Sequence, residues 1–196
     1  MLLVRLPRID VRLSDSPPGR EIGAYLCERA RGIYFNRVAQ GILDIPGRPA
    51  DYLRGRSRQA VRTNLHRADD AHLTCNAVHD RAERRSAAIA FGMGESQSLI
   101  IRASDLFWVA CNPDNENVGA LWATVDTEWA MLRFLVANCS EARYALHTTL
   151  VNYLSTKGVR YLFAESASAL LLTPGLQYFQ KLLGYRVAHL RVRRSA

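Results

Sequence analysis

The sequence predicts an α/β fold in which a mixed, mostly antiparallel sheet is flanked by helices and preceded by an N-terminal helical extension. Three observations predict this fold. From residue 72 onward, candidate strands alternate with amphipathic helices. Three neighbouring strands between residues 105 and 137 are joined by short polar connections, which favour an antiparallel meander. The chain then closes on a helix, a glycine and a last strand, so that the order from residue 72 is β-α-β-β-β-α-β-α-β.

The length and composition predict one domain. A chain of 196 residues with 48% hydrophobic content can bury one core but is short for two. We therefore expect a single domain over residues 1–196, with the strand and helical extension in residues 1–71 and the core in residues 72–196.

The N-terminal extension reads as a strand followed by two helices. Residues 3–13 have a strand pattern, residues 14–19 form a turn cluster, and apolar residues recur at helical spacing over 20–40. A second helix is expected to begin near Ala50, after the breakers at residues 46–49, and to include residues 53–68. Arg5 and Pro7 interrupt the first apolar run, and no segment reaches the roughly 20 apolar residues that span a bilayer. We expect a cytoplasmic protein without membrane association.

The core begins with a strand over His72–Val78, and Asp80 and Glu83 then open a helix that runs through Ala90. The three strands of the predicted meander are Asp105–Cys111, Val118–Asp126 and Met131–Ala137.

The second half of the core alternates helices and strands. Ser140 is placed to cap a helix over Glu141–Lys157, which Gly158 ends. The following elements are a strand over Arg160–Glu165, a short helix from Thr173 to Gly184, and a final strand over Tyr185–Arg193.

The charge is carried almost entirely by arginine. The chain has 24 arginines, only two lysines and a net charge of +8. Because the guanidinium group pairs bidentately with phosphate and carboxylate, RNA or another anionic partner is one interpretation. Codon composition and solubility explain the same bias equally well. The four cysteines follow neither a zinc pattern nor a disulfide framework, so we expect no metal.

The closing stretch and the order of elements resemble the GCN5-related N-acetyltransferase (GNAT) superfamily over residues 72–193. The stretch reads Tyr-Phe-Gln-Lys-Leu-Leu-Gly-Tyr over Tyr178–Tyr185 and is similar to the family signature before its last strand. The basic segment Tyr52–Ala68 is similar to a helix of FemABX-like and BioF2-like members. This resemblance implies a GNAT-like fold and transfer of an acyl or aminoacyl group, from a CoA- or tRNA-type donor, to an amine acceptor.

The resemblance also implies where the donor binds. Acetyl-CoA or another acyl-CoA would lie along the end of the third meander strand and the start of the next helix, on Leu135, Val136, Ala137, Asn138, Ser140, Arg143 and Tyr144. Typical members carry glycines in this turn, whereas residues 138–147 contain none. The missing glycines favour an alternative function, a catalytically silent module that binds a protein partner or nucleic acid. The closing motif favours the enzyme.

Two residues are candidates for catalysis. Glu165 ends its strand where the sheet of the family splays, so its carboxylate is a candidate general base, or else a strand-end acid that pairs with arginine. Tyr178 is a candidate proton donor to a leaving thiolate, or else an amphipathic core aromatic. Phe179, next to it, stands at the position of the family's tyrosine. His147 is expected to be a surface or packed histidine.

Two further segments are candidates for contact with partners. Arg54, Arg58 and Arg62 recur every four residues, so on one helix they would form a stripe for phosphate or RNA, or a solvated or internally paired face. The apolar trio Leu170–Leu172 lies in a small-residue loop and predicts either a lid over an acyl chain or a homodimer interface.

Overall fold

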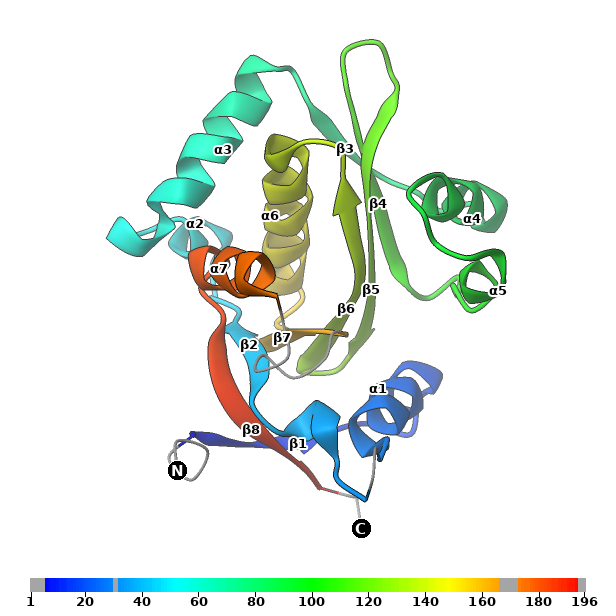
Figure 1. Cartoon of the computed structure of the whole chain (residues 1–196), viewed down its shortest axis with the longest axis vertical. Helices are drawn as coiled ribbons and strands as arrows, with labels where there is room; N and C mark the ends of the chain where they lie inside the picture. The colour runs from blue at the N-terminus through cyan, green and yellow to red at the C-terminus, as the bar shows by residue number, and fades with distance from the viewer. Residues whose placement is uncertain (1–5, 30–31, 166–172, 194–196) are drawn as a thin grey trace.

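The structure is a computed structural model that describes residues 6–29, 32–165 and 173–193. Within these ranges eight strands form one sheet in the order β1-β8-β2-β7-β6-β5-β4-β3 (Figure 1). The strands are β1 (Arg8–Arg12), β2 (Gln40–Asp44), β3 (Thr74–Ala77), β4 (Leu106–Cys111), β5 (Asn117–Asp126), β6 (Trp129–Ala137), β7 (Tyr161–Ala164) and β8 (Arg186–Arg193).

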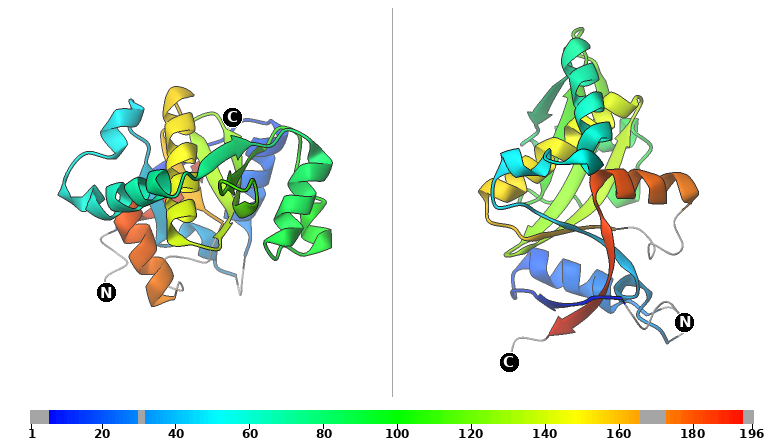
Figure 2. Two further views of the ribbon diagram at one scale, coloured as in Figure 1. Left: turned by 90° about the horizontal axis from the view of Figure 1, so that it is seen from above. Right: turned by 90° about the vertical axis from the view of Figure 1, so that its left-hand side faces the viewer.

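Helices cover both faces of the sheet. The α-helices are α1 (Pro17–Cys27), α2 (Pro49–Tyr52), α3 (Gln59–Asp70), α4 (Arg81–Ala90), α5 (Glu95–Ser98), α6 (Ser140–Thr156) and α7 (Pro174–Leu183), and the 3₁₀ helices are η2 (Phe35–Arg37) and η3 (Arg56–Arg58). One face carries α6 with α2, α3 and α7 around it, and the opposite face carries α4, α5 and α1 (Figures 1 and 2).

The predicted sheet type is confirmed. The meander β3-β4-β5-β6 is antiparallel throughout, and β2 is antiparallel to both β7 and β8. The β6/β7 and β1/β8 pairs are parallel. The β6/β7 pair is parallel because α6 forms the crossover between them, as a parallel connection requires.

Most predicted elements of the core are confirmed to within a few residues. Asp80 caps α4 by accepting a hydrogen bond from the backbone N–H of Glu83 at 2.8 Å. Gly184 ends α7 in the left-handed conformation, with φ of 86°. The short helix α5 was not predicted, because its four residues are polar and carry no apolar period.

The predicted helix over residues 20–40 is wrong in its second half. Helix α1 ends at Cys27, Gly32 has a φ of 81°, and Gln40 opens strand β2. Residues 40–43 are all buried, because β7 and β8 flank both edges of β2 and the apolar clusters on the two faces take in Ile42 and Leu43. Only two of these four residues are apolar, so the segment shows neither the alternation nor the apolar run by which a strand is recognised. The N-terminal segment is therefore built into the sheet rather than appended to it.

Three apolar clusters fill the space between sheet and helices. The largest lies beneath α6 and includes Leu121, Leu146 and Leu162. A second lies beneath α4 and includes Phe107 and Trp122, and a third beneath α1 includes Ile22 and further apolar residues. None of the described helices has the length and apolar character needed to cross a bilayer.

Candidate functional site

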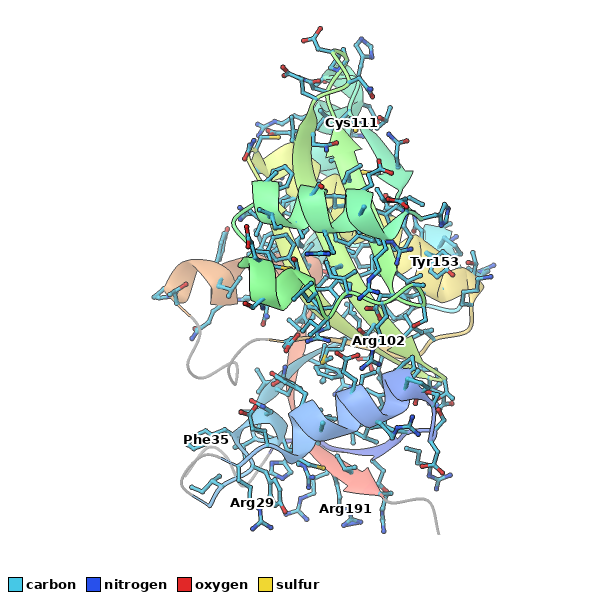
Figure 3. All side chains as sticks on the ribbon, turned by 90° about the vertical axis from the view of Figure 1, so that its right-hand side faces the viewer. Arg29, Phe35, Arg102, Cys111, Tyr153 and Arg191 are labelled. Carbon is cyan, nitrogen blue, oxygen red and sulfur yellow. The ribbon has the colours of Figure 1, made fainter. Side chains whose placement is uncertain are left out.

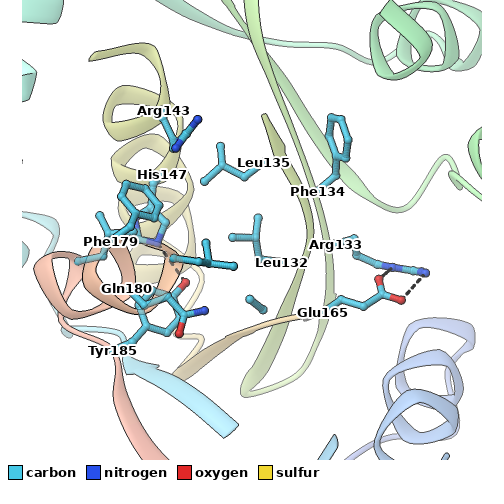
Figure 4. Close-up of a pocket in the computed structure, with 13 residues that line it drawn as sticks. Leu132, Arg133, Phe134, Leu135, Arg143, His147, Glu165, Phe179, Gln180 and Tyr185 are labelled. Atoms are coloured by element: carbon cyan, nitrogen blue, oxygen red, sulfur yellow. Dashed lines mark hydrogen bonds and ion pairs between the residues drawn. The ribbon is translucent and has the colours of Figure 1, made fainter. Parts of the chain in front are cut away.

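A cavity opens where β6 and β7 separate. The two strands pair from Trp129 opposite Tyr161 to Leu132 opposite Ala164, and β6 then continues without β7. The cavity has a volume of about 180 Å³ and lies between the splayed strands, α6 and α7 (Figure 4). Its lining includes Leu132, Arg133, Leu135, Arg143, His147, Glu165, Phe179, Gln180 and Tyr185. It is thus enclosed by the elements that the sequence predicted around a donor site.

A β-bulge redirects β6 at this point. Trp122 of β5 lies opposite Phe134, and Ala123 lies opposite Leu132, so Arg133 has no partner in the register. A bulge of this kind bends its strand and re-aims the neighbouring side chains. Figure 4 shows Leu132 and Leu135 on the cavity side of β6, whereas Arg133 points away from α6.

Arg133 joins two carboxylates on the opposite face of the sheet. Its Nη2 donates to Glu165 Oε1 at 3.3 Å, its Nε donates to the second oxygen of Glu165, and its Nη1 donates to Glu21 of α1. The guanidinium carbon lies 4.2 Å from the centre of the Trp122 ring, and the side chain is only 7% exposed. Arg102, which lies above α1 in Figure 3, pairs with the other oxygen of Glu21 at 3.1 Å.

The ion pair between Arg133 and Glu165 separates two cavities. Arg133 and Glu165 line the cavity between the splayed strands and also a second one, of about 390 Å³, beside α1 on the other face of the sheet. Glu21, Glu28 and Tyr25 contribute to the second cavity. The pair therefore forms a wall that both spaces share.

The two predicted catalytic residues have different positions. Glu165 lies at the cavity, and both its oxygens accept hydrogen bonds from Arg133, as in the arginine-paired interpretation. Tyr178 is 63% exposed and is not among the residues that line the cavity, whereas its neighbour Phe179 is. Their catalytic roles stay predictions.

The residues predicted to bind the donor lie along the path from β6 into α6. Leu135 and Arg143 line the cavity. Tyr144 packs edge-on against Phe179, with ring centres 5.2 Å apart. Val136 is partly buried, Ala137 belongs to the core beneath α6, and Asn138 and Ser140 are exposed where α6 begins.

The N-terminus of α6 has features of an anion site. Cys139 occupies the N-cap position, and no side chain caps the helix there. The first amide groups of a helix lack partners within the helix and favour negative charge. Arg143, one turn further on, has a buried Nε that makes no hydrogen bond, and its guanidinium lies 5.6 Å from the ring centre of Phe179. Glu141 in the first turn opposes this preference with its own charge.

A buried chain of side chains borders the other end of the cavity. His147 Nδ1 lies 3.3 Å from the Tyr52 hydroxyl, and His147 Nε2 lies 3.1 Å from the Tyr185 hydroxyl. Burial, with a smaller contribution from the Arg58 charge, lowers the pKa of His147 to about 3, so its ring is neutral at physiological pH. His147 is thus a packed histidine, one of the two predicted interpretations.

Several of these residues were missed from the sequence. Arg133 lies inside the apolar run of β6, and a lone arginine there is a signal that a partner must compensate its charge. Tyr185 was part of the closing motif, but its partner His147 lies 38 residues away along the chain. Tyr52, the other partner of His147, lies 95 residues from that histidine.

The prediction that Arg54, Arg58 and Arg62 form a stripe on one helix is wrong, because they do not lie on one helix. Gly55, with φ of 88°, breaks the predicted helix, and α3 begins only at Gln59. Arg54 pairs with Asp51 at 2.8 Å, and Arg62 donates to the backbone carbonyl of Gly55 at 2.9 Å.

Arg58 packs against the end of α7. Its guanidinium nitrogens lie 1.8 and 2.1 Å from the point where a Cβ atom on Gly184 would be, and its guanidinium carbon lies 5.3 Å from the ring centre of Tyr52. Among the described residues, the expected pairing with acids of the sheet is therefore not found for Arg54, Arg58 or Arg62, whose partners lie in α2, at the end of α7 and in the segment between α2 and α3. Contact of these arginines with phosphate or RNA stays a prediction. Leu170–Leu172 lie outside the described residues.

Comparisons with known proteins find a likeness of structure only. No protein-family model matches the chain, and no curated protein sequence matches it. L-PGS from Bacillus licheniformis is similar over 76% of this chain and 57% of its own, with 12% identity and a TM-score of 0.55. The C-terminal DUF2156 domain of an Agrobacterium fabrum protein assigned as a lysylphosphatidylglycerol synthetase is similar over 77% and 57%, with 14% identity and a TM-score of 0.52.

A GCN5-related N-acetyltransferase from Kribbella flavida also matches, over 77% of this chain and 54% of its own, with 13% identity and a TM-score of 0.44. The chain spans little more than half the length of these three structures. At such identities the likeness shows the fold alone. The order of elements, the mostly antiparallel sheet and the parallel β6/β7 pair that splays beside α6 agree with the GNAT-like arrangement that the sequence predicts.

Proposed function

We propose that the chain is an N-acyltransferase that moves an acyl group from an acyl-CoA donor to an amine. The observation that carries this proposal is the cavity between the splayed ends of β6 and β7, which runs beside Arg143 of α6 and ends at Glu165. An extended, phosphate-bearing donor fits such a path, with its phosphates near α6 and its acyl group near the ion pair.

The donor's phosphates would be held by the start of α6 and by Arg143. Helix N-termini bind phosphate through free amide groups and the helix dipole. Arg143 lines the cavity, and its guanidinium supplies a cationic group in place of the close backbone approach that glycines allow. The residues present therefore fit an anionic group at this end of the cavity.

The carrier arm would lie along β6. Beyond Leu132, where the last pair with β7 ends, the edge of β6 that faces α7 has no strand beside it among the described residues. An extended amide-containing arm can hydrogen-bond to such an edge as an added strand does. Coenzyme A, when bound, supplies the activated thioester, and this chain supplies its position and the exclusion of water.

The amine would reach the junction of the two cavities from the α1 side. Glu28 lines the second cavity there, beside Glu21 and Glu165, which are already paired with Arg133. Catalysis would come mostly from holding the amine beside the acyl carbon, with Glu165 or water taking the proton. The ion pair with Arg133 keeps the Glu165 carboxylate at the junction of the two cavities.

Binding of coenzyme A tests this proposal. Thermal unfolding should shift upward with CoA, acetyl-CoA and longer acyl-CoAs, because a ligand that binds only the folded state stabilises it. Arg143→Ala should weaken CoA binding about tenfold, the size expected for one hydrogen bond to a charged group. Arg67→Ala, an exposed arginine on α3, is the matched control. Wild-type protein whose melting is unchanged at millimolar CoA would contradict the proposal.

A second candidate is aminoacyl transfer from a tRNA-type donor. It is favoured by the two similar structures with TM-scores of 0.55 and 0.52, one named L-PGS and the other assigned as a lysylphosphatidylglycerol synthetase, and by the net charge of +8. A filter assay with radiolabelled aminoacyl-tRNA distinguishes the donors. Label transfer to an amine without any response to CoA would replace the acyl-CoA proposal.

A third candidate is a binding module without turnover, which Phe179 in place of the family's tyrosine favours. Such a module would bind RNA with a steep dependence on salt, because each neutralised phosphate adds close to one to the log–log slope. Salt-dependent binding of RNA, combined with absence of both transfer reactions, would establish this function. Acyl transfer from CoA would exclude it.

A further inference from the structure

The three side chains Tyr52, His147 and Tyr185 form a continuous hydrogen-bonded chain. It runs from the backbone carbonyl of Leu183, 3.2 Å from the Tyr52 hydroxyl, through His147 to the Tyr185 hydroxyl. His147 and Tyr185 both line the cavity between β6 and β7, so the hydrogen bond between them lies at its wall (Figure 4).

The carbonyl at one end fixes the direction of every hydrogen bond in the chain. A carbonyl oxygen can only accept a hydrogen bond, so the Tyr52 hydroxyl donates its single proton to the carbonyl of Leu183. The Tyr52 oxygen then accepts from His147, which requires the proton of the neutral imidazole to be on Nδ1. Nε2 is left as an acceptor and takes the proton of the Tyr185 hydroxyl.

The consequence concerns what Tyr185 offers to the cavity. A tyrosine hydroxyl normally presents either a donor or an acceptor. Here its proton is held by His147, so only oxygen lone pairs remain for a bound molecule. Tyr185 therefore selects an N–H group rather than a carbonyl or a thiolate.

The chain is suited to orientation and not to proton transport. It ends on the carbonyl of Leu183, which does not pass a proton on. Burial also disfavours the imidazolium form of His147, as its lowered pKa shows, so the ring is a weak base. Burial likewise raises the pKa of Tyr185 well above its ordinary value. The Tyr52 and His147 side chains are accordingly positioning residues that act through Tyr185.

We infer that Tyr185 accepts a hydrogen bond from an amide N–H of the donor's pantetheine arm, with His147 and Tyr52 holding its lone pairs toward the cavity. This inference rests on the proposed acyl-CoA function. The distance along α6 agrees with it. His147 lies seven residues after Ser140, which at 1.5 Å per residue is roughly 10 Å from the first turn, within the length of an extended arm whose phosphates lie at that turn.

Nuclear magnetic resonance of the ligand-free protein tests the direction of the chain. In wild-type protein labelled with ¹⁵N-histidine, His147 should show a protonated Nδ1 and an unprotonated Nε2 between pH 6 and pH 8, roughly the range in which an ordinary histidine titrates. Tyr52→Phe removes the acceptor for Nδ1–H and should shift the ring toward the Nε2–H tautomer. A wild-type ring protonated on Nε2 would overturn the inference.

Calorimetric binding tests the ligand. Tyr185→Phe removes only the hydroxyl and should weaken CoA binding about tenfold, while binding of phosphoadenosine diphosphate, the nucleotide part of CoA without the arm, should not change. Tyr153→Phe is the matched control, because Tyr153 packs on Trp108, away from the residues that line the cavity.

The outcomes separate this inference from the proposed function. Equal affinity of wild type and Tyr185→Phe for CoA would overturn the inference, as would a parallel loss for both ligands, which indicates a structural effect. If wild-type protein binds neither CoA nor phosphoadenosine diphosphate, the proposed acyl-CoA function is wrong. The contact between Tyr185 and the pantetheine arm is then wrong as well. If wild-type protein binds phosphoadenosine diphosphate and CoA with equal affinity, the pantetheine arm adds nothing to binding. This result would contradict the role of Tyr185 but not the acyl-CoA function.

Discussion

The guanidinium of Arg133 binds both carboxylate oxygens of Glu165 at the point where β6 and β7 separate. The same guanidinium also binds Glu21 of α1, which pairs with Arg102 as well, so two arginines compensate two acids on the face of the sheet opposite α6. The β-bulge makes this arrangement possible because it turns Arg133 toward α1. Arg133 thus links the cavity to the packing of α1.

Arg133→Ala should destabilise the fold strongly. The change leaves Glu165 without its cation and Glu21 with Arg102 alone, and loss of one partner of a buried ion pair costs about 3 kcal/mol or more. Urea unfolding at pH 7 measures the loss. The control is Arg160→Ala, whose pair with Glu128 is 60% and 50% exposed and should contribute less than about 1 kcal/mol. Equal losses for the two variants would show that Arg133 is not structurally important.

Gly184→Ala should also destabilise, for two separable reasons. The backbone φ of 86° is strained for alanine, and the new Cβ atom would overlap the Arg58 guanidinium. We expect a loss of about 2 to 4 kcal/mol in the free energy of unfolding.

The double variant Gly184→Ala with Arg58→Ala separates the two reasons. Removing the guanidinium relieves the overlap but leaves the strained φ, so the two changes should be less than additive. A coupling energy of zero in the double-mutant cycle would contradict the close approach of Arg58 to Gly184.

His147 should make the fold sensitive to mild acid. Its folded-state pKa of about 3 lies below the ordinary value of 6.5, so between these values protons bind preferentially to the unfolded chain. Stability from this group is therefore complete above pH 6.5 and is lost as the pH falls toward 3, by about 2 kcal/mol between pH 7 and pH 5. Urea unfolding at these two pH values measures the loss.

His147→Gln is the comparison for this pH dependence, because glutamine has no proton to gain. The wild-type loss between pH 7 and pH 5 should exceed that of the variant by about 2 kcal/mol. The same loss in both proteins would show that other groups account for it.

Asp126→Ala should loosen the N-terminal segment from the sheet. Asp126 is buried at the end of β5 and accepts hydrogen bonds from the Ser14 N–H and the Ser16 hydroxyl, each at 2.8 Å, just before α1 begins. Its loss leaves these donors unsatisfied, and we expect a cost of about 2 kcal/mol. Hydrogen exchange should quicken in α1. Asp114→Ala, in the exposed turn between β4 and β5, should leave both quantities unchanged.

Local signals in the sequence were sufficient for the meander β3-β4-β5-β6, for α6 and α7, and for the GNAT-like arrangement from β3 to β8. These elements have clear periods and end at residues such as Asp80 and Gly184, whose chemistry acts within one turn of the chain. The sequence also located the region of the cavity, since Leu135, Arg143 and Glu165 all line it.

The tertiary structure alone decided how that region is built. Residues 40–43 form a strand because β7 and β8 pair with its two edges and apolar clusters on both faces take in Ile42 and Leu43, not because of their own pattern. Glu165 is paired because a bulge brings Arg133 to it. Tyr185 offers only lone pairs to the cavity because His147 accepts its proton and is itself held by Tyr52, both from distant segments. Periodicity and capping report interactions within a few residues, whereas burial, ion pairing and the choice of tautomer depend on groups that only folding brings together.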